Sequence, residues 1–222
     1  MTSRGRVIGR SVLQGIGALA DEDRPRRIEG RPAPSYPVQI VTSAALGEPA
    51  LARLLDRAVV AGQEQEIVAA LGLVEDGVSR IAAIERASGG TRGIVVGVRD
   101  AQELVPLGSL GDGMGRMLGI ALSLQAARGG TLLIDELDTG LHHTVLQKVG
   151  RLVHETARRL DVTAVATTHR LDCVRALGAI ARGDVEAPGE VGLFRVERGR
   201  PNGVRFSEAE ITRLAGYDIK AR

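Results

Sequence analysis

Residues 131–136 read TLLIDE, a short apolar run followed at once by two carboxylates. A run of this kind, preceded by glycines and ended by charge, is typical of a strand buried in a parallel sheet. Ligands of α/β proteins bind at the carboxyl ends of such strands, so Asp135 and Glu136 stand where chemistry is expected. Because side chains alternate along a strand, we expect the two carboxylates to point apart and to have different tasks.

Two interpretations of this carboxylate pair are open. One carboxylate can hold Mg²⁺ while its neighbour polarises an attacking water, which fits nucleotide hydrolysis. Alternatively, Asp135 and Glu136 only end the strand and cap the helix that follows. The hexapeptide alone does not decide between them.

The segments around this strand alternate between helical and extended patterns, which predicts an α/β fold with a parallel sheet flanked by helices. Upstream, the patterns predict a small helical insert, broken at Gly62, and an antiparallel element with a turn at 88–90. The expected strands are 37–43, 78–85, 92–98, 103–107, 131–135, a second buried strand at 162–167, 191–197 and 203–206; the expected helices lie within 51–74, 111–128, 141–160, 171–182 and from 207.

The composition fits a globular protein. Of 222 residues, 44% are hydrophobic and 25% charged, with a formal net charge of +2 and one cysteine. These values argue against disorder and a disulfide framework, and Cys173 is expected to be a small buried hydrophobe. We find no secretory signal and no apolar stretch of the roughly 18 residues that a membrane span needs. A cytoplasmic protein without a membrane partner is expected.

A second polar cluster follows the strand expected at 162–167. It reads Thr167-Thr168-His169, and a histidine there can donate a hydrogen bond to a phosphate oxygen. The adjacent His142 and His143 suggest a metal site only weakly, because neighbouring helical residues point about 100° apart and no further ligand has suitable spacing.

A glycine-rich segment opens the helix before the TLLIDE strand. Ser109 can cap that helix, and Gly108, Gly111 and Gly113 let backbone amides approach an anion. This predicts a phosphate contact; an ordinary glycine-rich turn with a serine cap is the alternative.

Together, residues 107–118 (LGSLGDGMGRML), 132–143 (LLIDELDTGLHH) and 165–173 (VATTHRLDC) resemble the second half of an ABC-type ATPase. They are similar to the signature motif, the Walker B strand with its D-loop, and the switch-histidine loop of predicted AAA-type ATP-binding proteins related to the overcoming-lysogenisation-defect (OLD-like) ATPases. The resemblance covers roughly residues 37–222.

The resemblance implies a role for each matching residue. Asp135 would hold Mg²⁺ through water, Glu136 would be the general base and His169 would sense the γ-phosphate. ATP would lie in a composite site of a head-to-tail dimer, where the residues of one chain face the nucleotide held by the other. Those facing residues are Ser109, Gly111, Asp112 and Gly113, with Leu141 and His142 in the D-loop at the seam.

The sequence contains no GxxxxGK[ST] loop, since Lys148 and Lys220 are its only lysines and neither precedes Ser or Thr. By resemblance, the chain is the C-terminal part of such an ATPase, lacking the Walker A segment. Residues 1–36 are expected to be a poorly structured leader or linker. The expected divisions of the remainder are 37–108 for the insert and strands, 109–182 for the motif core, and 183–222 for C-terminal strands and a helix.

The expected function is therefore an ATP-binding and ATP-hydrolysing module, with a role in DNA repair or phage defence by family analogy only. The alternative is a non-catalytic or split subunit that supplies the signature and Walker B half to a Walker A-bearing partner. A nucleic-acid partner also rests on analogy, because the chain is only 2% aromatic and shows no basic patch interleaved with aromatics.

Overall fold

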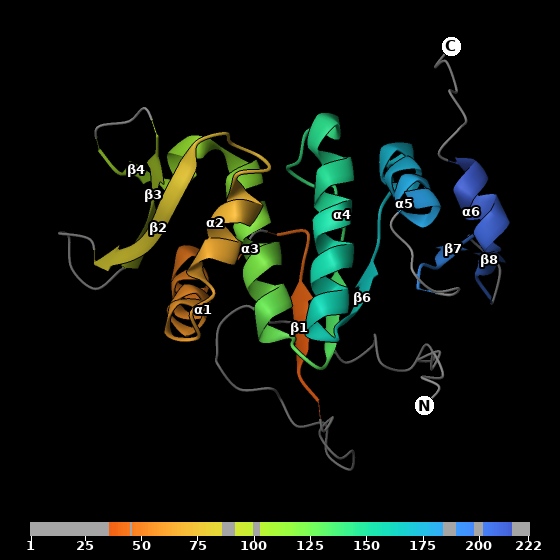
Figure 1. The fold of residues 1–222 in the computed structure, drawn as a ribbon, viewed down its shortest axis with the longest axis horizontal. Coiled ribbons are helices and arrows are strands. Elements are labelled where there is room, and N and C mark those ends of the chain that lie inside the picture. Colours follow the sequence, from red (N-terminus) through yellow and green to blue (C-terminus); the bar gives the residue numbers. More distant parts are fainter. Residues whose placement is uncertain are drawn as a thin grey trace. The chain divides into compact units, whose positions relative to one another are not determined.

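A three-stranded parallel sheet forms the centre of the computed structural model (Figure 1). Its strands are β1 (Val38–Val41), β5 (Thr131–Ile134) and β6 (Thr163–Ala166), in the order β1-β5-β6. The register aligns Val38 with Thr131 and Thr131 with Thr163. The carboxyl ends of β5 and β6 therefore lie side by side, which brings the segments after both strands together.

The structure describes residues 36–44, 46–85, 92–99, 103–183, 190–197 and 202–214. They belong to a single unit that spans Tyr36–Arg222. The leader or linker expected over residues 1–36 lies outside the described residues except for Tyr36, and so does the turn expected at 88–90.

Two helices pack on the parallel sheet, and a third helix packs against one of them. α3 (Asp112–Ala126) contacts β1 and β5, while α4 (His143–Leu160) contacts β6 and α5 (Leu171–Gly183). α4 is amphipathic, and its apolar side chains recur at intervals of three and four residues, as expected of a helix with one face in the core. The buried apolar residues of α4 are Leu146, Val149, Val153, Ala157 and Leu160.

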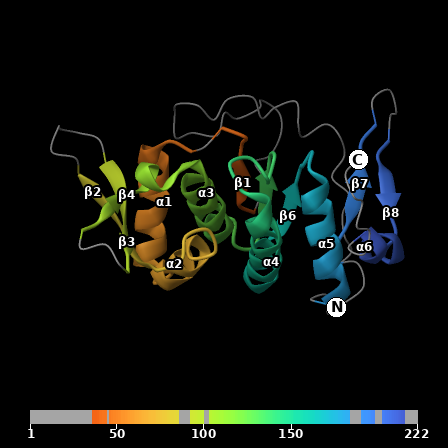
Figure 2. The ribbon, with the colours of Figure 1, turned by 90° about the horizontal axis from the view of Figure 1, so that it is seen from above.

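A second, antiparallel sheet lies beside α1 and α2 (Figures 1 and 2). It consists of β2 (Val78–Glu85), β3 (Arg92–Val98) and β4 (Val105–Pro106). The helices α1 (Glu48–Val60) and α2 (Glu64–Leu71) form the helical insert. The chain turns between them at Gly62, whose φ of +72° is a conformation that glycine adopts readily.

The C-terminal elements form a smaller group beside α5. They are the antiparallel pair β7 (Leu193–Arg195) and β8 (Val204–Phe206), followed by α6 (Glu208–Leu214), which packs on α5. The predicted mixed α/β fold, with a parallel sheet flanked by helices, a helical insert and antiparallel strands, is confirmed. No helix among the described residues has the length and apolar character needed to span a membrane.

The prediction that the strand at 162–167 is buried is wrong. Thr163, Val165 and Ala166 of β6 are exposed, and the exposed fraction of Val165 is 52%. β6 pairs with β5 on one side, and within the described residues no strand lies on its other side. An apolar sequence is buried only where a neighbour covers it. Cys173 is buried as predicted, and this burial raises the pKa of its thiol.

Candidate nucleotide site

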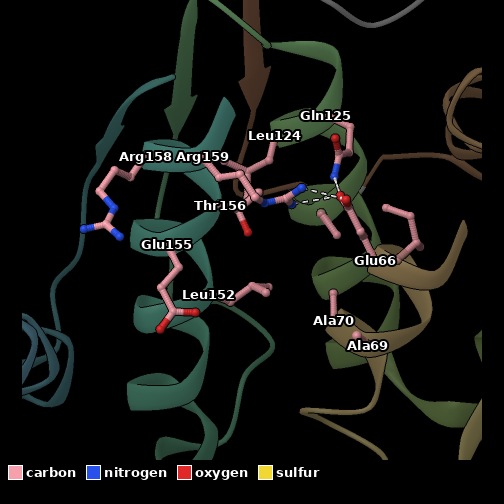
Figure 3. A pocket seen from close by; sticks show the side chains of 12 residues that line it. Glu66, Ala69, Ala70, Leu124, Gln125, Leu152, Glu155, Thr156, Arg158 and Arg159 are labelled. Atoms are coloured by element: carbon pink, nitrogen blue, oxygen red, sulfur yellow. Dashed lines mark hydrogen bonds and ion pairs between the residues drawn. The ribbon is translucent and has the colours of Figure 1, made fainter. Parts of the chain in front are cut away.

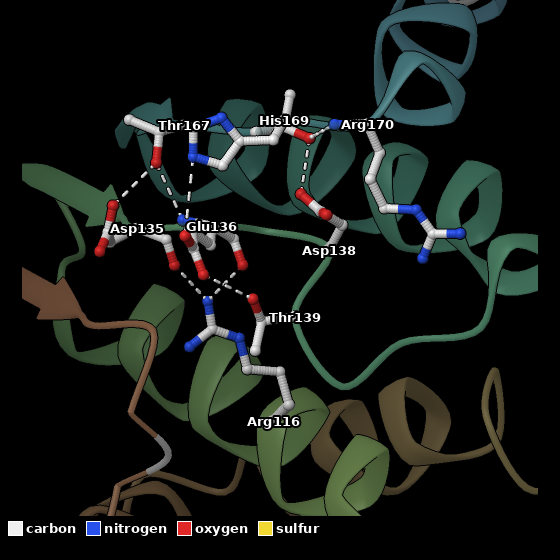
Figure 4. Close-up of polar contacts among 9 residues, drawn as sticks. Arg116, Asp135, Glu136, Asp138, Thr139, Thr167, His169 and Arg170 are labelled. Atoms are coloured by element: carbon white, nitrogen blue, oxygen red, sulfur yellow. Dashed lines mark hydrogen bonds and ion pairs between the residues drawn. The ribbon is translucent and has the colours of Figure 1, made fainter.

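The segments that follow β5 and β6 are joined by hydrogen bonds through Thr167 (Figure 4). The Thr167 hydroxyl donates to Oδ1 of Asp135 over 2.9 Å and accepts from the backbone N–H of Glu136, also over 2.9 Å. The Thr167 backbone accepts from the Leu137 N–H and donates to the Ile134 carbonyl, each over 2.9 Å. Thr167 therefore holds both carboxylate-bearing residues in place, a role that the sequence analysis did not assign to it.

Glu136 is in the left-handed region of backbone space, with φ of +51°. Its Oε2 accepts a hydrogen bond from Thr139 Oγ1 over 2.9 Å, and its Oε1 lies 3.6 Å from Nε2 of His169. The side chain of His169 is 82% exposed and that of Glu136 is 38% exposed. The predicted base and the predicted phosphate sensor thus lie together at the solvent boundary, where a bound molecule can reach both.

Asp135 and Glu136 have different partners, as expected, but both residues follow the end of β5, so the alternation of strand side chains is not the cause. The Asp135 carboxylate contacts Thr167, whereas the Glu136 carboxylate contacts Thr139 and His169. The capping interpretation is wrong, because the next helix is α4, whose N-cap is His142 with no side-chain cap hydrogen bond.

A second pair of contacts joins the same two segments further from the strands. Thr168 Oγ1 donates to Oδ1 of Asp138 over 2.6 Å, and the Arg170 guanidinium donates to the Leu141 carbonyl over 3.4 Å. The segment that carries His169 and the segment that leads into α4 are therefore linked at two places.

Arg116 is a site residue that the sequence analysis missed. It is the one charged residue among the buried residues of α3 and is only 3% exposed. Its guanidinium donates to the backbone carbonyls of Asp135 and Glu136, beneath the two carboxylates in Figure 4. The available signal was one arginine among buried apolar residues, since buried charges are almost always paired.

The glycine-rich segment 107–113 lies at the start of α3. Ser109 is exposed in a short 3₁₀ helix, Leu107–Leu110, and Asp112 is the first residue of α3. The prediction that Ser109 caps the helix is wrong, because the N-cap is Gly111, with φ of +87° and no side-chain cap bond. The exposure of Ser109, Gly111 and Asp112 leaves them accessible to a partner.

Gly113 has a packing reason to be glycine. A Cβ atom built there would lie 2.8 Å from the Gly140 carbonyl oxygen, too close for any side chain. The start of α3 therefore touches the segment between β5 and α4. Leu141, in that segment, is buried in the core of its own chain at 4% exposure, whereas His142 is exposed.

The paired histidines do not form a metal site. The His142 and His143 rings lie 4.1 Å apart, and Nδ1 of His142 is 3.0 Å from the Thr144 hydroxyl. Within the part of the chain that the structure describes, no three His, Cys, Asp or Glu side chains gather closely enough to hold a metal ion.

The residues around Asp135 fit a magnesium nucleotide. Mg²⁺ is usually held by one or two carboxylates together with waters and substrate phosphates, so a cage of protein ligands is not required. Asp135 is exposed at the carboxyl end of β5, and among the described residues its carboxylate accepts a hydrogen bond from a hydroxyl group. A carboxylate oxygen and a neighbouring hydroxyl are hard donors of the kind that this ion prefers.

A separate pocket of about 640 Å³ lies between α2, α3 and α4 (Figure 3). Its rim includes an ion pair in which the Arg159 guanidinium donates to Glu66 over 2.6 and 2.8 Å, and Gln125 donates to the same carboxylate. None of the predicted site residues lines this pocket.

Comparison with known proteins gives one family match. The family model described as "AAA domain, putative AbiEii toxin, Type IV TA system" matches residues 42–171. No curated protein matches the chain.

Solved structures of low identity also align. One comes from a study of ATP-driven dimerization and DNA-stimulated activation of SMC ATPases; it is 11% identical, with a TM-score of 0.49 over 73% of this chain and 94% of that one. The Smc head domain with coiled coil and joint from Pyrococcus yayanosii is 14% identical, with a TM-score of 0.47 over 74% of this chain and 30% of that one. The SmcHead bound to the C-winged helix domain of ScpA is 14% identical, with a TM-score of 0.46 over 76% and 55%.

The family match covers the carboxylate pair, the Thr167–His169 segment and the whole of α3, more than half of the 222 residues. The chain therefore belongs to this family of AAA domains.

Proposed function

We propose that this chain hydrolyses ATP in a composite site to which it contributes the Walker B, switch-histidine and signature residues. The observation that carries the proposal is the cluster of Asp135, Glu136 and His169 at the carboxyl ends of β5 and β6, linked through Thr167. Asp135 would hold Mg²⁺ through water, Glu136 would accept a proton from the attacking water, and His169 would contact the γ-phosphate.

The second part of this proposal concerns the partner. Ser109, Gly111, Asp112, Gly113 and His142 would face a nucleotide held by the P-loop of another subunit in a head-to-tail arrangement. The exposure of Ser109, Gly111 and Asp112 at the start of α3 supports this role. By family analogy, we extend the proposal to a function in DNA repair or phage defence, and stimulation of ATP hydrolysis by added DNA tests that extension.

Substitution of the base tests the proposal directly. In an assembly of the full chain that hydrolyses ATP, Glu136→Gln should lower the rate by about 10²- to 10⁴-fold, because general-base catalysis contributes that much. Bound ATP should persist, since the amide keeps the shape of the side chain. The matched control is Glu155→Gln on an exposed surface of α4, which should change the rate less than about twofold. Equal rates for the two variants would refute Glu136 as the base.

Equilibrium binding of labelled ATP with Mg²⁺ to the full chain alone distinguishes two possibilities: a chain that binds nucleotide by itself, and a subunit that needs a partner with a P-loop. Binding that is lost in Asp135→Ala would mean that this chain builds a nucleotide site by itself. An absence of binding would mean that a P-loop-bearing segment is required, which supports the split or non-catalytic subunit.

The open edge of β6 favours that second candidate function. The Thr163 N–H donates to Gly130 and the Thr167 N–H donates to Ile134, so these residues face β5. Because alternate residues of a parallel strand bond to opposite sides, the N–H groups of Ala164 and Ala166 point to the outer edge. A further strand can pair there.

Proline at this edge tests the pairing. Ala164→Pro should abolish association with a polypeptide that carries a GxxxxGK[ST] strand and loop, because it removes an outward N–H and places a ring on the edge. Val38→Pro, at the first residue of the opposite outer strand β1, is the control and should leave association intact. Unchanged association of Ala164→Pro would exclude β6 as the contact.

A further inference from the structure

The guanidinium of Arg116 binds three backbone carbonyls in the segments that follow two neighbouring strands of the parallel sheet. One terminal nitrogen donates to the carbonyl of Thr42, which follows β1. The other donates to the carbonyls of Asp135 and Glu136 over 2.5 and 2.8 Å (Figure 4). Arg116 therefore reaches from α3 to the ends of both β1 and β5, directly behind the proposed base.

A charge at this position is costly, so its presence needs a reason. Arg116 is 3% exposed, and burial lowers the pKa of its guanidinium, while the carboxylates of Asp135, Glu136 and Asp138 oppose that change. Its Nε has no hydrogen-bond partner among the described residues. The neighbouring positions Met114, Met117 and Leu118 are fully buried apolar residues. An apolar side chain would avoid the desolvation of a charge, so the carbonyl contacts, together with the attraction of these carboxylates, must account for the arginine.

Two successive carbonyls meet at one nitrogen only if the backbone changes direction between them. In a strand, successive carbonyls point to opposite sides, so those of Asp135 and Glu136 would diverge. The φ of +51° at Glu136 provides the change, although glutamate rarely adopts it. The same turn places the Glu136 carboxylate beside Thr139 and His169.

We propose that Arg116 is a positioning residue: by binding the Asp135 and Glu136 carbonyls, it holds Glu136 in the left-handed conformation and so aims the carboxylate at the site. The conformational part stands on the contacts alone. Its consequence for catalysis rests on the proposed role of Glu136 as the base.

Amide hydrogen exchange of the full chain, measured by NMR, tests the conformational part without ATP. The probe is the Leu137 N–H, whose bond to the Thr167 carbonyl depends on the conformation of Glu136. Arg116→Lys keeps a charge but loses the planar fork, so it should accelerate exchange of this amide by at least about tenfold. The control is the Val162 N–H, which donates to the Ala157 carbonyl. It follows Asp161, which is the other residue with a positive φ that is not glycine in the described part of the chain. Equal acceleration at both amides would overturn the proposal.

A double-mutant cycle gives a second, independent readout from thermal unfolding. Glycine adopts the left-handed conformation without strain, so Glu136→Gly should raise the midpoint of thermal unfolding when Arg116 is present. When Arg116 is already substituted, Glu136 has left that conformation, so the same change should raise the midpoint less. Asp161→Gly should give the same shift in both backgrounds. Arg116→Gln, which removes the buried charge, replaces Arg116→Lys if the lysine variant does not fold. An identical Glu136→Gly shift in both backgrounds would overturn the proposal.

The catalytic consequence is measured separately in an assembly that hydrolyses ATP. Arg116→Lys should lower kcat by at least about tenfold with KM for ATP unchanged, and should have no further effect when combined with Glu136→Gln. Faster exchange at Leu137 with unchanged kcat would confirm the hold of Arg116 on Glu136 and count against Glu136 as the base. Unchanged exchange of the Leu137 amide would refute the positioning role of Arg116, whatever the rate of ATP hydrolysis.

Discussion

The neighbouring strands β5 and β6 have similar apolar sequences, TLLI and TAVA, and opposite environments. β5 lies between two strands, and Thr131, Leu132 and Ile134 are buried, whereas three of the four residues of β6 are exposed. Both strands lead into polar residues of the candidate site. An apolar run therefore predicts a strand, but the neighbours of the strand decide whether it is buried. The exposed edge of β6 marks where this sheet can accept a further strand.

The largest effect should come from a cavity in the covered strand. Leu132→Ala, at a side chain with 0% exposure, should lower the free energy of unfolding by roughly 2–5 kcal/mol. Val165→Ala in β6, at 52% exposure, should cost less than about 0.5 kcal/mol. Urea unfolding of the full chain measures both values. Similar losses for the two variants would mean that β6 is covered in solution.

Proline substitutions in β6 compare its edge that faces β5 with its outer edge. Val165→Pro removes an N–H that faces β5 and leaves a carbonyl without its partner, so it should cost roughly 1–3 kcal/mol. Ala164→Pro removes an outward N–H and should cost less than about 1 kcal/mol, because proline is tolerated at strand edges. The same urea titrations compare them. A larger loss for Ala164→Pro would mean that the outer edge is already paired within the chain.

The smallest effect should come from the ion pair that joins α2 to α4. The side chains of Arg159 and Glu66 are 49% and 38% exposed, so the pair should contribute roughly 0.2–1 kcal/mol. Glu66→Gln, compared with Glu155→Gln as an exposed control, should reveal that contribution in the free energy of unfolding at pH 7.

This contribution should depend on pH with a defined sign. The hydrogen bonds from Arg159 hold the pKa of Glu66 below its ordinary value of 4.5. Because the folded pKa is the lower one, the contribution is present above pH 4.5 and is lost as the pH falls through the folded value. The difference between the parent chain and Glu66→Gln should therefore shrink toward pH 3. A difference of equal size at pH 7 and at about pH 3 would contradict the assignment.

The order and type of the elements were predictable because their signals are local. The apolar run before Asp135, the break at Gly62 and the 3.6-residue period of α4 each depend on residues near one another in the chain. The juxtaposition of Asp135 with the Thr167–His169 segment was also predictable, because parallel neighbours end at one edge of a sheet. The residue roles at that edge stay predictions for the experiments above.

The contacts that shape the site were not predictable in this way. The Thr167 hydroxyl reaches Asp135 across 32 positions, and Arg116 reaches Thr42 across 74. The cap at Ser109 was predicted from residue preference, yet the chain inserts a short 3₁₀ helix and begins α3 after Gly111. Residue preference gives the local options, and packing selects among them.

The sequence by itself determined which segments are helices and strands, and which residues bring carboxylates, a histidine and glycines to the ends of those segments. Only the tertiary structure decided which strand is covered, which backbone carbonyls Arg116 binds and that Glu136 turns into the left-handed conformation. The physical reason is that exposure and backbone strain depend on contacts between residues distant in the chain, where the cost of one conformation is offset by bonds that another element supplies.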